Sequence, residues 1–130
     1  MRLRSHQFES GPAMFETTIL IDEQFLEIVG PLNAKAASTP SDLRKFPRFA
    51  VQLDVKCQGL DDHWLPVGVP FKGAAMNVSR GGIMFSTDAI SDAPFVRLEL
   101  LRGYDVLAEC TIKVVRRGAG ALAGPFVKRA

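Results

Sequence analysis

Two short polar stretches of the chain contain the residues whose types and spacing could do chemistry. The first is RKFPR, in which Arg44, Lys45 and Arg48 surround a phenylalanine and a proline. Guanidinium groups bind phosphate oxygens in pairs and stack flat on aromatic or purine rings. Because Pro47 resists continuation of a helix and pushes Phe46 towards extended geometry, we expect a stiff arm that leads into the next strand. Taken alone, such a segment is more typical of the basic end of a linker.

The second stretch, NVSRGG, is a polar turn between two apolar runs. Asn77 and Ser79 lie two residues apart, so both are expected to project from the same side of a strand end. Their amide and hydroxyl groups suit a base edge or a backbone turn equally well. The following Arg80, Gly81 and Gly82 allow positive φ and a close approach of the backbone to its neighbours. Taken alone, this pattern is typical of an ordinary turn.

The composition describes one ordinary globular domain with a small net charge. The chain has 130 residues, of which 47% are hydrophobic and 23% charged, and its net charge is +2. A chain of this length can bury a modest core. Its basic residues nevertheless gather in short groups, at 44–48, 116–117 and 128–129. Local clusters on a near-neutral protein suit a compact anion better than duplex DNA, which rewards many phosphate contacts.

Cysteine and histidine content argues against a disulfide framework and against a zinc site. Cys57 and Cys110 fall at apolar positions of expected strands, which predicts two free, buried thiols. The chain has no CxxC pair and only two histidines, so we expect no metal or other cofactor. No apolar run has signal-peptide length or approaches the ~20 residues that span a bilayer. We therefore expect a cytoplasmic protein without a membrane span.

Residues 1–42 are expected to form an N-terminal extension and linker, and residues 43–128 the main domain. Within the extension, TTILI favours a strand by its β-branched content, and a short helix should follow it. Asp22 is expected to cap this helix and Gly30 to end it, with an apolar side formed by Phe25, Leu26 and Val29. This segment can either cover the core of the main domain or offer a surface to a partner. Residues 31–43, rich in Pro, Ala and Ser, indicate a linker.

After the linker, apolar and polar residues alternate with the period of two that is typical of strands. Three runs show it clearly, with expected inward residues Phe49, Val51, Leu53, Val55 and Cys57; Val96, Leu98 and Leu100; and Val106, Ala108, Cys110, Ile112 and Val114. Residues 66–78 and 82–87 indicate further strands, and RGYD a tight hairpin turn. The tail ALAGPFVKR could form a last strand, which Pro125 would confine to an edge. Five or six such strands predict a mainly all-β fold, an antiparallel sheet that closes into a small barrel.

The two polar stretches, taken together, resemble the signature of a known family. An RxxxR ahead of the first barrel strand, followed about thirty residues later by an NxSxxG that opens the strand GIMFS, resembles the PilZ family of cyclic di-GMP receptors. Order, spacing and alternating strands agree over residues 43–117, and less closely to Phe126. The resemblance implies a six-stranded antiparallel β-barrel of the PilZ type that binds cyclic di-GMP on its outer surface.

The same resemblance implies a set of ligand-binding residues. Arg44 and Arg48 would hold the phosphates and would stack on the guanines or hydrogen-bond to them. Asn77 and Ser79 would meet a guanine edge, and Gly82 would let the turn pass close to the ligand. Asn77 stands where the family usually carries aspartate, so one acceptor and one charge are missing there. Further candidates for contact with the ligand are Lys45, Arg80 and Gly81.

The chemistry of the ligand agrees with these residues. Cyclic di-GMP is a compact dianion with two large π-faces, and arginine suits both features. The apolar Leu43 before the first arginine favours one bound ligand over an intercalated pair. The arm would become ordered on binding, at a cost in conformational entropy, and the altered surface would signal to an unidentified downstream protein. These features predict a second-messenger receptor or adaptor in bacterial signalling, which binds no DNA.

Two other binding functions stay open at this point. A degenerate PilZ module would act only through protein contacts, although both arginines and the Asn/Ser/Gly set are intact. A small barrel could also bind single-stranded nucleic acid, but that mode needs aromatic residues exposed on a basic face. Most aromatic residues here fall at inward positions. An enzyme is not expected, because Asp61, Asp62 and His63 lie in a polar loop without a nucleophile–base pair.

Overall fold

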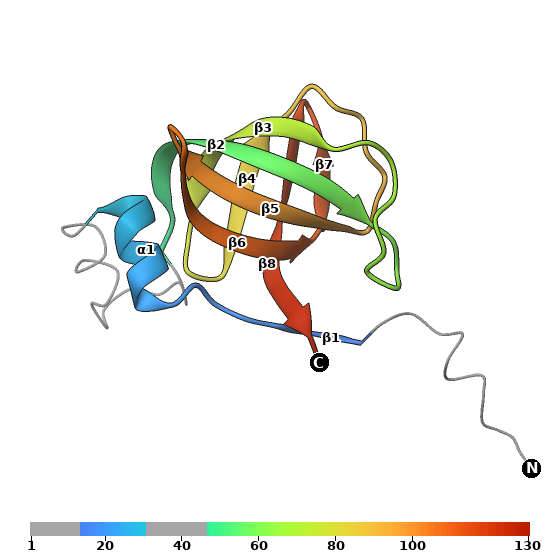
Figure 1. The fold of residues 1–130 in the computed structure, drawn as a ribbon, viewed down its shortest axis with the longest axis horizontal. Coiled ribbons are helices and arrows are strands. Elements are labelled where there is room, and N and C mark those ends of the chain that lie inside the picture. Colours follow the sequence, from blue (N-terminus) through green and yellow to red (C-terminus); the bar gives the residue numbers. More distant parts are fainter. Residues whose placement is uncertain (1–13, 31–46) are drawn as a thin grey trace, which may run out of the picture.

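The computed structural model describes residues 14–30 and 47–130, and the expected linker at 31–43 lies outside this part of the chain. Figure 1 shows the described elements, which are β1 (Phe15–Thr17), α1 (Asp22–Val29), β2 (Phe49–Leu60), β3 (Phe71–Val78), β4 (Gly82–Ser86), β5 (Phe95–Arg102), β6 (Asp105–Lys113), β7 (Arg116–Gly118) and β8 (Ala121–Arg129). In residues 14–30 and 47–130, no helix is long and apolar enough to cross a membrane.

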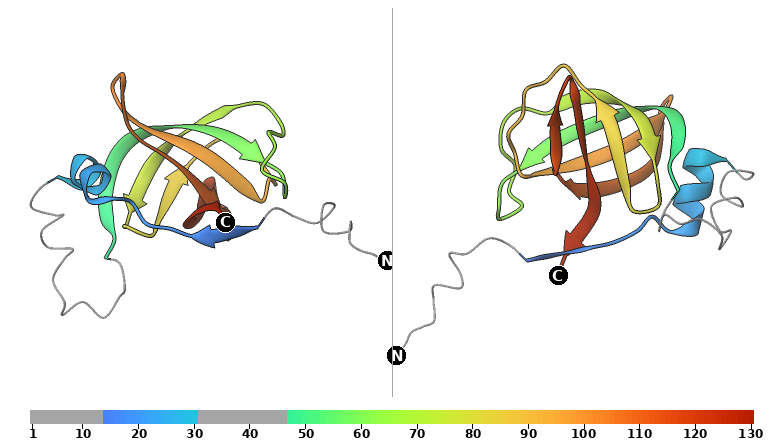
Figure 2. Two further views of the ribbon diagram at one scale, coloured as in Figure 1. Left: turned by 60° about the horizontal axis from the view of Figure 1, so that its bottom comes forward. Right: turned by 180° about the vertical axis from the view of Figure 1, so that it is seen from behind.

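Six of these strands form a closed antiparallel ring, which confirms the mainly β fold predicted from the alternation. Their order around the ring is β8, β4, β3, β2, β5 and β6, and β6 pairs again with β8. Closure removes the two edges that an open sheet would leave unpaired. The short strands β1 and β7 lie outside this path and both pair with β8 (Figure 2).

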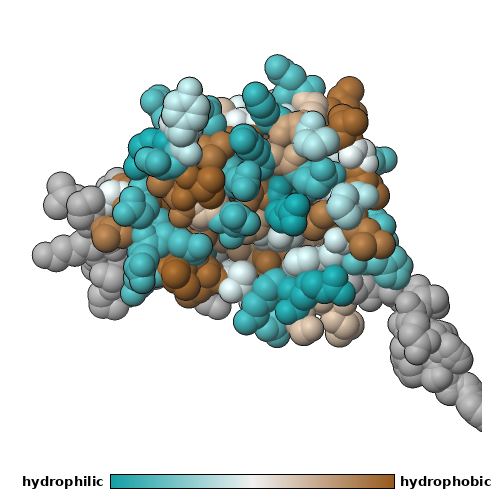
Figure 3. Space-filling view, viewed as in Figure 1, coloured by the Kyte–Doolittle hydropathy of each residue, from teal (hydrophilic) through white to brown (hydrophobic). Residues whose placement is uncertain are grey.

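The core fills the inside of the ring with the residues that the period of two directs inward. Leu53, Val55 and Cys57 on β2 are buried, as are Val96, Leu98 and Leu100 on β5. Phe85 and Phe126 join them in one hydrophobic cluster. The outer face carries the alternate residues, and Figure 3 shows hydrophilic residues there, interrupted by separate hydrophobic patches. The alternation therefore predicts the inner face of β2 and β5 correctly.

On β6 the predicted alternation holds only in part. Val106, expected inside, is 49% exposed, whereas Leu107 packs against the core. The pairing with β5 shifts between Leu100 and Leu101, which leaves Leu107 as an extra residue on β6. Such a bulge moves every residue on one side of it to the opposite face. The bulge lies next to the predicted hairpin turn, which is present where Arg102 pairs with Asp105.

The prediction that Pro125 would confine the last strand to an edge is wrong, because β8 has neighbours on both sides. The N–H of Phe126 donates to the carbonyl of Gly81 at 2.8 Å, so Gly82 and Pro125 form a non-hydrogen-bonded pair. The missing N–H of Pro125 would therefore point away from β4. On the other side, β8 pairs with β7 up to Ala123 and with β6 from Phe126 onward. Pro125 lies between these two pairings, so neither strand needs its missing N–H.

The N-terminal segment covers one end of the ring, so the core interpretation of residues 15–30 is the one that the structure shows. Leu20, Phe25, Ile28 and Val29 belong to the same hydrophobic cluster as the ring. Leu26, expected on the apolar side, is 44% exposed, and Ile28 is buried in its place. Residues three and four apart share a helix face, so Phe25 is accompanied by Ile28 and Val29.

The ends of α1 also differ from expectation in one respect. The helix begins at Asp22 and its N-cap is Ile21, so Asp22 does not cap it. Ile21 has no side-chain acceptor, but its backbone N–H donates to Oε1 of Gln24 at 3.3 Å. Gly30 ends the helix as expected, with φ of 88° and its N–H donating to Leu26. Arg102 of β5 donates to the last carbonyls of the helix, those of Glu27 and Ile28, at 3.0 and 3.3 Å.

Both cysteines are free thiols, as expected. Cys57 is buried and Cys110 is half-buried. Burial raises the pKa of each thiol to about 12, and the charge of Glu109 adds to the rise in the pKa of Cys110. A raised pKa disfavours the thiolate, which is the form of cysteine that attacks electrophiles and binds metals.

Ring closure depends on Gly124, and its replacement by alanine should destabilise the fold. A Cβ at this position would lie well inside van der Waals contact of the Lys113 carbonyl oxygen, which is backbone and cannot rotate away. We expect Gly124→Ala to lower the free energy of unfolding by more than about 2 kcal/mol, measured by urea denaturation. Gly103→Asn is the control, because Gly103 has φ of 64° but open space around it, and asparagine tolerates that φ. Equal losses in the two variants would contradict the prediction.

Candidate functional site

A groove on the outside of the ring gathers most of the residues that the sequence singled out. It crosses the side of the ring formed by β3, β4, β8 and β7, which lie next to one another in Figure 2, right. Its volume is about 720 Å³, within the range of roughly 300–1,000 Å³ that is usual for small-molecule sites. The expected site residues that line it are Arg48, Asn77, Ser79, Gly81 and Gly82. Two stretches about thirty residues apart thus meet in one place.

Of the three other expected residues, two lie outside the described part of the chain and the third is directed elsewhere. Arg44 and Lys45 lie outside the described residues, so nothing places them. Arg80 is described, and its side chain is directed to the N-terminal segment instead. A role for Arg44 and Lys45 in ligand binding therefore stays a prediction, whereas the contacts of Arg80 are described below.

Ser79 shapes the turn between β3 and β4. Its Oγ accepts hydrogen bonds from the backbone N–H groups of Gly81 and Gly82 at 3.2 and 3.1 Å. Its own N–H donates to the carbonyl of Gly82 at 2.9 Å. Serine at this position thus satisfies the backbone donors of the turn and holds it against the end of the groove.

The two glycines of the turn act through their small size and not through an unusual φ. Neither Gly81 nor Gly82 has a positive φ, which corrects that part of the expectation. The expected close approach is present at Gly82, where a Cβ would lie 2.8 Å from the carbonyl oxygen of Gly124 on β8. Gly82 thus lets β4 and β8 come together beneath the groove.

Asn77 offers its amide to the groove. It is half-buried near the end of β3, and its only described side-chain contact is a long one, from Nδ2 to Sδ of Met84 at 3.7 Å. Sulfur is a weak acceptor, so this contact uses little of the hydrogen-bonding capacity of the amide. The carboxamide is available to a ligand that presents both a donor and an acceptor.

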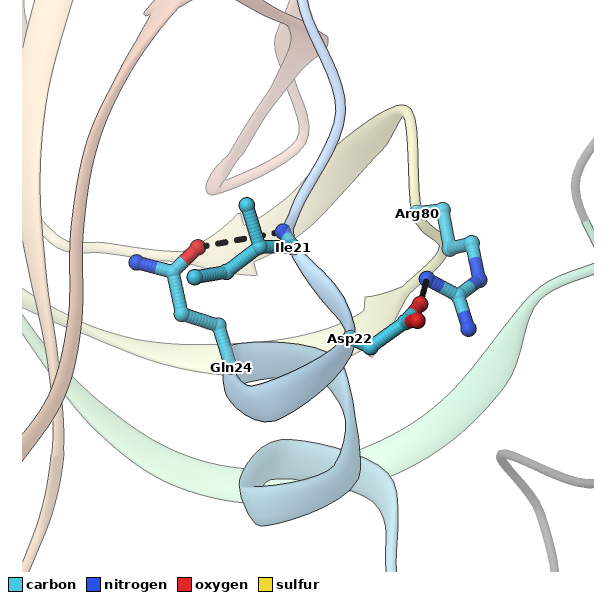
Figure 4. A network of polar contacts seen from close by, with 4 residues as sticks. All are labelled: Ile21, Asp22, Gln24 and Arg80. Atoms are coloured by element: carbon cyan, nitrogen blue, oxygen red, sulfur yellow. Dashed lines mark hydrogen bonds and ion pairs between the residues drawn. The ribbon is translucent and has the colours of Figure 1, made fainter.

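Arg80 connects the turn to the helix, as Figure 4 shows. Its Nη1 lies 2.7 Å from Oδ1 of Asp22, and its guanidinium lies 4.5 Å from the centre of the Phe25 ring. The backbone carbonyl of Arg80 also accepts from the N–H of Leu20 at 2.9 Å. The guanidinium is thereby occupied within the protein, on the side of the turn that faces α1.

The charge of the groove has a single sign. In the described part of the chain, its lining contains two arginines, Arg48 and Arg116, and no carboxylate. Both are exposed, and no carboxylate of residues 14–30 or 47–130 pairs with either. Unpaired guanidinium groups on one concave surface attract anions and bind phosphate well.

Three segments of the lining were not predicted from the sequence. Thr17, Thr18 and Ile19 form one wall, residues 115–116 another, and residues 123–125 part of the floor. The sequence analysis identified Arg116 only as part of a basic pair and did not predict where in the fold it would lie. The other segments carried no signal, because nothing in a local pattern says which strands will be neighbours.

The acidic loop that was weighed as an enzyme site has a structural role. Oδ1 of Asp61 accepts from the backbone N–H groups of His63 and Leu65 at 2.8 and 3.0 Å. The hydrogen bond from Leu65 is the main cause that holds the pKa of this carboxyl below its usual value. Burial opposes this effect, and the hydrogen bond and the electrostatic effect of His63 lower the pKa further. Asp61, Asp62 and His63 are absent from the groove lining. Among the residues described, no cluster of histidine, cysteine and acidic side chains could hold a metal ion.

Comparisons with known proteins assign no family. No protein-family model matches the chain, and no curated protein matches it. Among solved structures, the inhibitor of motility MotI/DgrA of Bacillus subtilis is similar, with a TM-score of 0.48 and 20% identity. The match covers 68% of this chain and 44% of that one, so the chain spans less than half the length of that protein. A likeness of this size carries no argument about function.

The packing of Arg80 predicts unequal effects of replacing the two partners of its ion pair. The Arg80 side chain is 19% exposed and covers Phe25, whereas that of Asp22 is 91% exposed. We expect Arg80→Ala to lower the free energy of unfolding by about 1–2 kcal/mol, mostly through lost packing. Asp22→Asn should change it little, since an ion pair with an exposed carboxylate contributes little. Thermal and urea unfolding measure both, and a larger loss in Asp22→Asn would contradict this account.

Proposed function

We propose that this protein is a PilZ-type receptor for cyclic di-GMP that binds the dinucleotide in the groove and signals to a partner protein. One observation carries the proposal. Arg48, Asn77, Ser79 and Gly82, the described members of the motif, line one groove, and the charged residues among its described lining are all arginines. A compact dianion with two purine faces fits such a surface, because guanidinium groups bind phosphate and stack on purines.

Arg48 would bind a phosphate and the arm before it would complete the site. Arg48 lies one residue before β2, and it has no ion pair with the described residues. Arg44 precedes it by four residues, so an extended arm could bring both guanidinium groups to one ligand. Ordering the arm would cost conformational entropy and would change the surface around the groove. This change is the proposed signal to the downstream protein.

Asn77 would recognise a guanine edge, and Ser79 and Gly82 would position Asn77. An amide presents a donor and an acceptor together, which matches the mixed edge of guanine. The bonds that Ser79 makes to the turn would hold the Asn77 end of the groove in place. Gly81 and Gly82 keep side chains out of the groove at this point. Arg80 is not included in the proposed ligand set, because its guanidinium already binds Asp22.

Of the two alternatives, one is disfavoured by the lining of the groove. Proteins that bind single-stranded nucleic acid stack the bases on exposed aromatic side chains. Among residues 14–30 and 47–130, no aromatic residue lines the groove. The other alternative is a degenerate module that binds no nucleotide, and such a module would have no need for the unpaired arginines. A negative binding experiment would favour this alternative.

Calorimetry with cyclic di-GMP and the full chain tests the proposal. We expect binding at micromolar ligand with one molecule bound per chain, as Leu43 before the arm favours. Arg44→Ala and Arg48→Ala should each weaken binding by roughly 10- to 100-fold, the usual effect of losing a hydrogen bond to a charged group. Arg97→Ala is the matched control, because Arg97 is exposed on β5 and is not part of the groove lining.

Absence of binding at high micromolar ligand would reject the receptor function. Unchanged affinity in both arginine variants would show that the ligand binds elsewhere. A single-stranded oligonucleotide that competes with the dinucleotide would favour the nucleic-acid alternative.

Methionine methyl signals locate the ligand independently of any substitution. Met84 lines the groove, whereas Met76 sits at the β-bulge of β3 and is not part of the lining. Because purine rings shift nearby signals strongly, the Met84 methyl signal should move further than that of Met76 when cyclic di-GMP is titrated. The measurement is a methyl NMR spectrum of methionine-labelled protein. A larger shift at Met76 would place the ligand outside the groove.

A further inference from the structure

Two adjacent arginines on β7 have different surroundings. Arg117 donates to the carbonyl oxygens of Ser91 and Ala93 at 2.6 and 3.1 Å, and so fixes the loop before β5. Arg116 lines the groove, is exposed and has no described polar partner. Successive residues of a strand point to opposite sides, which explains why one guanidinium is used within the protein and the other is not.

Strand pairing places Arg116 in line with the motif. Asn77 pairs with Met84, Met84 with Ala123, and Ala123 with Arg116. These four residues cross β3, β4, β8 and β7 in a row, and all of them line the groove. Neighbouring strands are about 4.8 Å apart, so Arg116 lies roughly 14 Å from Asn77 along the sheet. Met84 and Ala123 form a low apolar floor between a polar group at one end and a cation at the other.

We propose that Arg116 is a ligand-binding residue that contacts the phosphate of cyclic di-GMP distant from Asn77. This inference rests on the proposed function and adds a residue outside the RxxxR and NxSxxG stretches. The ligand carries two phosphates, and a dinucleotide that places one guanine at Asn77 extends its other half across the floor towards β7. A guanidinium with no carboxylate beside it is the group that a phosphate there would meet.

The absence of an internal partner makes a purely structural role for Arg116 a weak alternative. An exposed arginine with no described hydrogen bond contributes little to the stability of a fold. Its neighbour Arg117, of the same residue type and on the same strand, has such a role and serves as the matched control. The two variants should therefore separate binding from stability.

A charge series at position 116, measured by calorimetry with the full chain and cyclic di-GMP, tests the proposal. We expect Arg116→Ala to weaken binding about tenfold and Arg116→Glu to weaken it further, because a carboxylate repels the phosphate. Arg116→Lys, which keeps the charge, should bind better than Arg116→Ala. Added salt should weaken binding by Arg116→Ala less than binding by the wild type, since one charged contact is missing. Each variant should melt within a few degrees of the wild type.

Arg117→Ala should give the opposite result, with a lower melting temperature and nearly unchanged affinity. The outcomes distinguish the two proposals. If the wild type binds, Arg48→Ala weakens binding and every variant at position 116 binds as tightly as the wild type, the role of Arg116 alone is overturned. No binding by the wild type would overturn both. A melting temperature lowered in Arg116→Ala as much as in Arg117→Ala would assign Arg116 a structural role and overturn the inference.

Discussion

The close approach of β4 and β8 is the constraint on which the rest of the structure depends. Gly82 faces Pro125 across this seam, and the backbone carbonyl of Gly124 occupies the space that a side chain at Gly82 would need. With the seam formed, β8 can also pair with β6 and so close the ring. β8 further pairs with β1 and β7, which become the two walls of the groove. One steric condition thus supports both the fold and the candidate site.

The turn between β3 and β4 serves the groove and the helix at the same time. Ser79 organises its backbone and lines the groove, whereas Arg80 turns to the other side and binds Asp22 and Phe25. A hydrogen-bonded turn of this kind is a structural feature, and it is also what positions Asn77. The structural and the functional interpretations of NVSRGG, which compete when the sequence is considered alone, are therefore compatible with one and the same arrangement.

Local patterns predicted those elements whose residues interact mainly with sequence neighbours. The inward residues of β2 and β5, the hairpin at Gly103 and the end of α1 at Gly30 follow from periodicity and turn chemistry. The errors occur where a distant segment alters the local rule. The bulge at Leu107 reverses the faces of Val106 and Leu107, and Pro125 is accommodated only because β8 changes neighbours at that residue.

The amino-acid sequence by itself determined the alternating strands and the spacing of the arginine, asparagine and serine residues that we propose to bind the ligand. These features depend on residue type and on separations of a few residues, which any single strand or turn already expresses. Only the tertiary structure decided that Thr17–Ile19 and Arg116 line the same groove as Asn77, since β8 brings them there from opposite ends of the chain. The pattern of a strand shows which of its sides faces inward but not which strand will lie next to it. The lining residues that come from distant segments can therefore be identified only once the ring has closed.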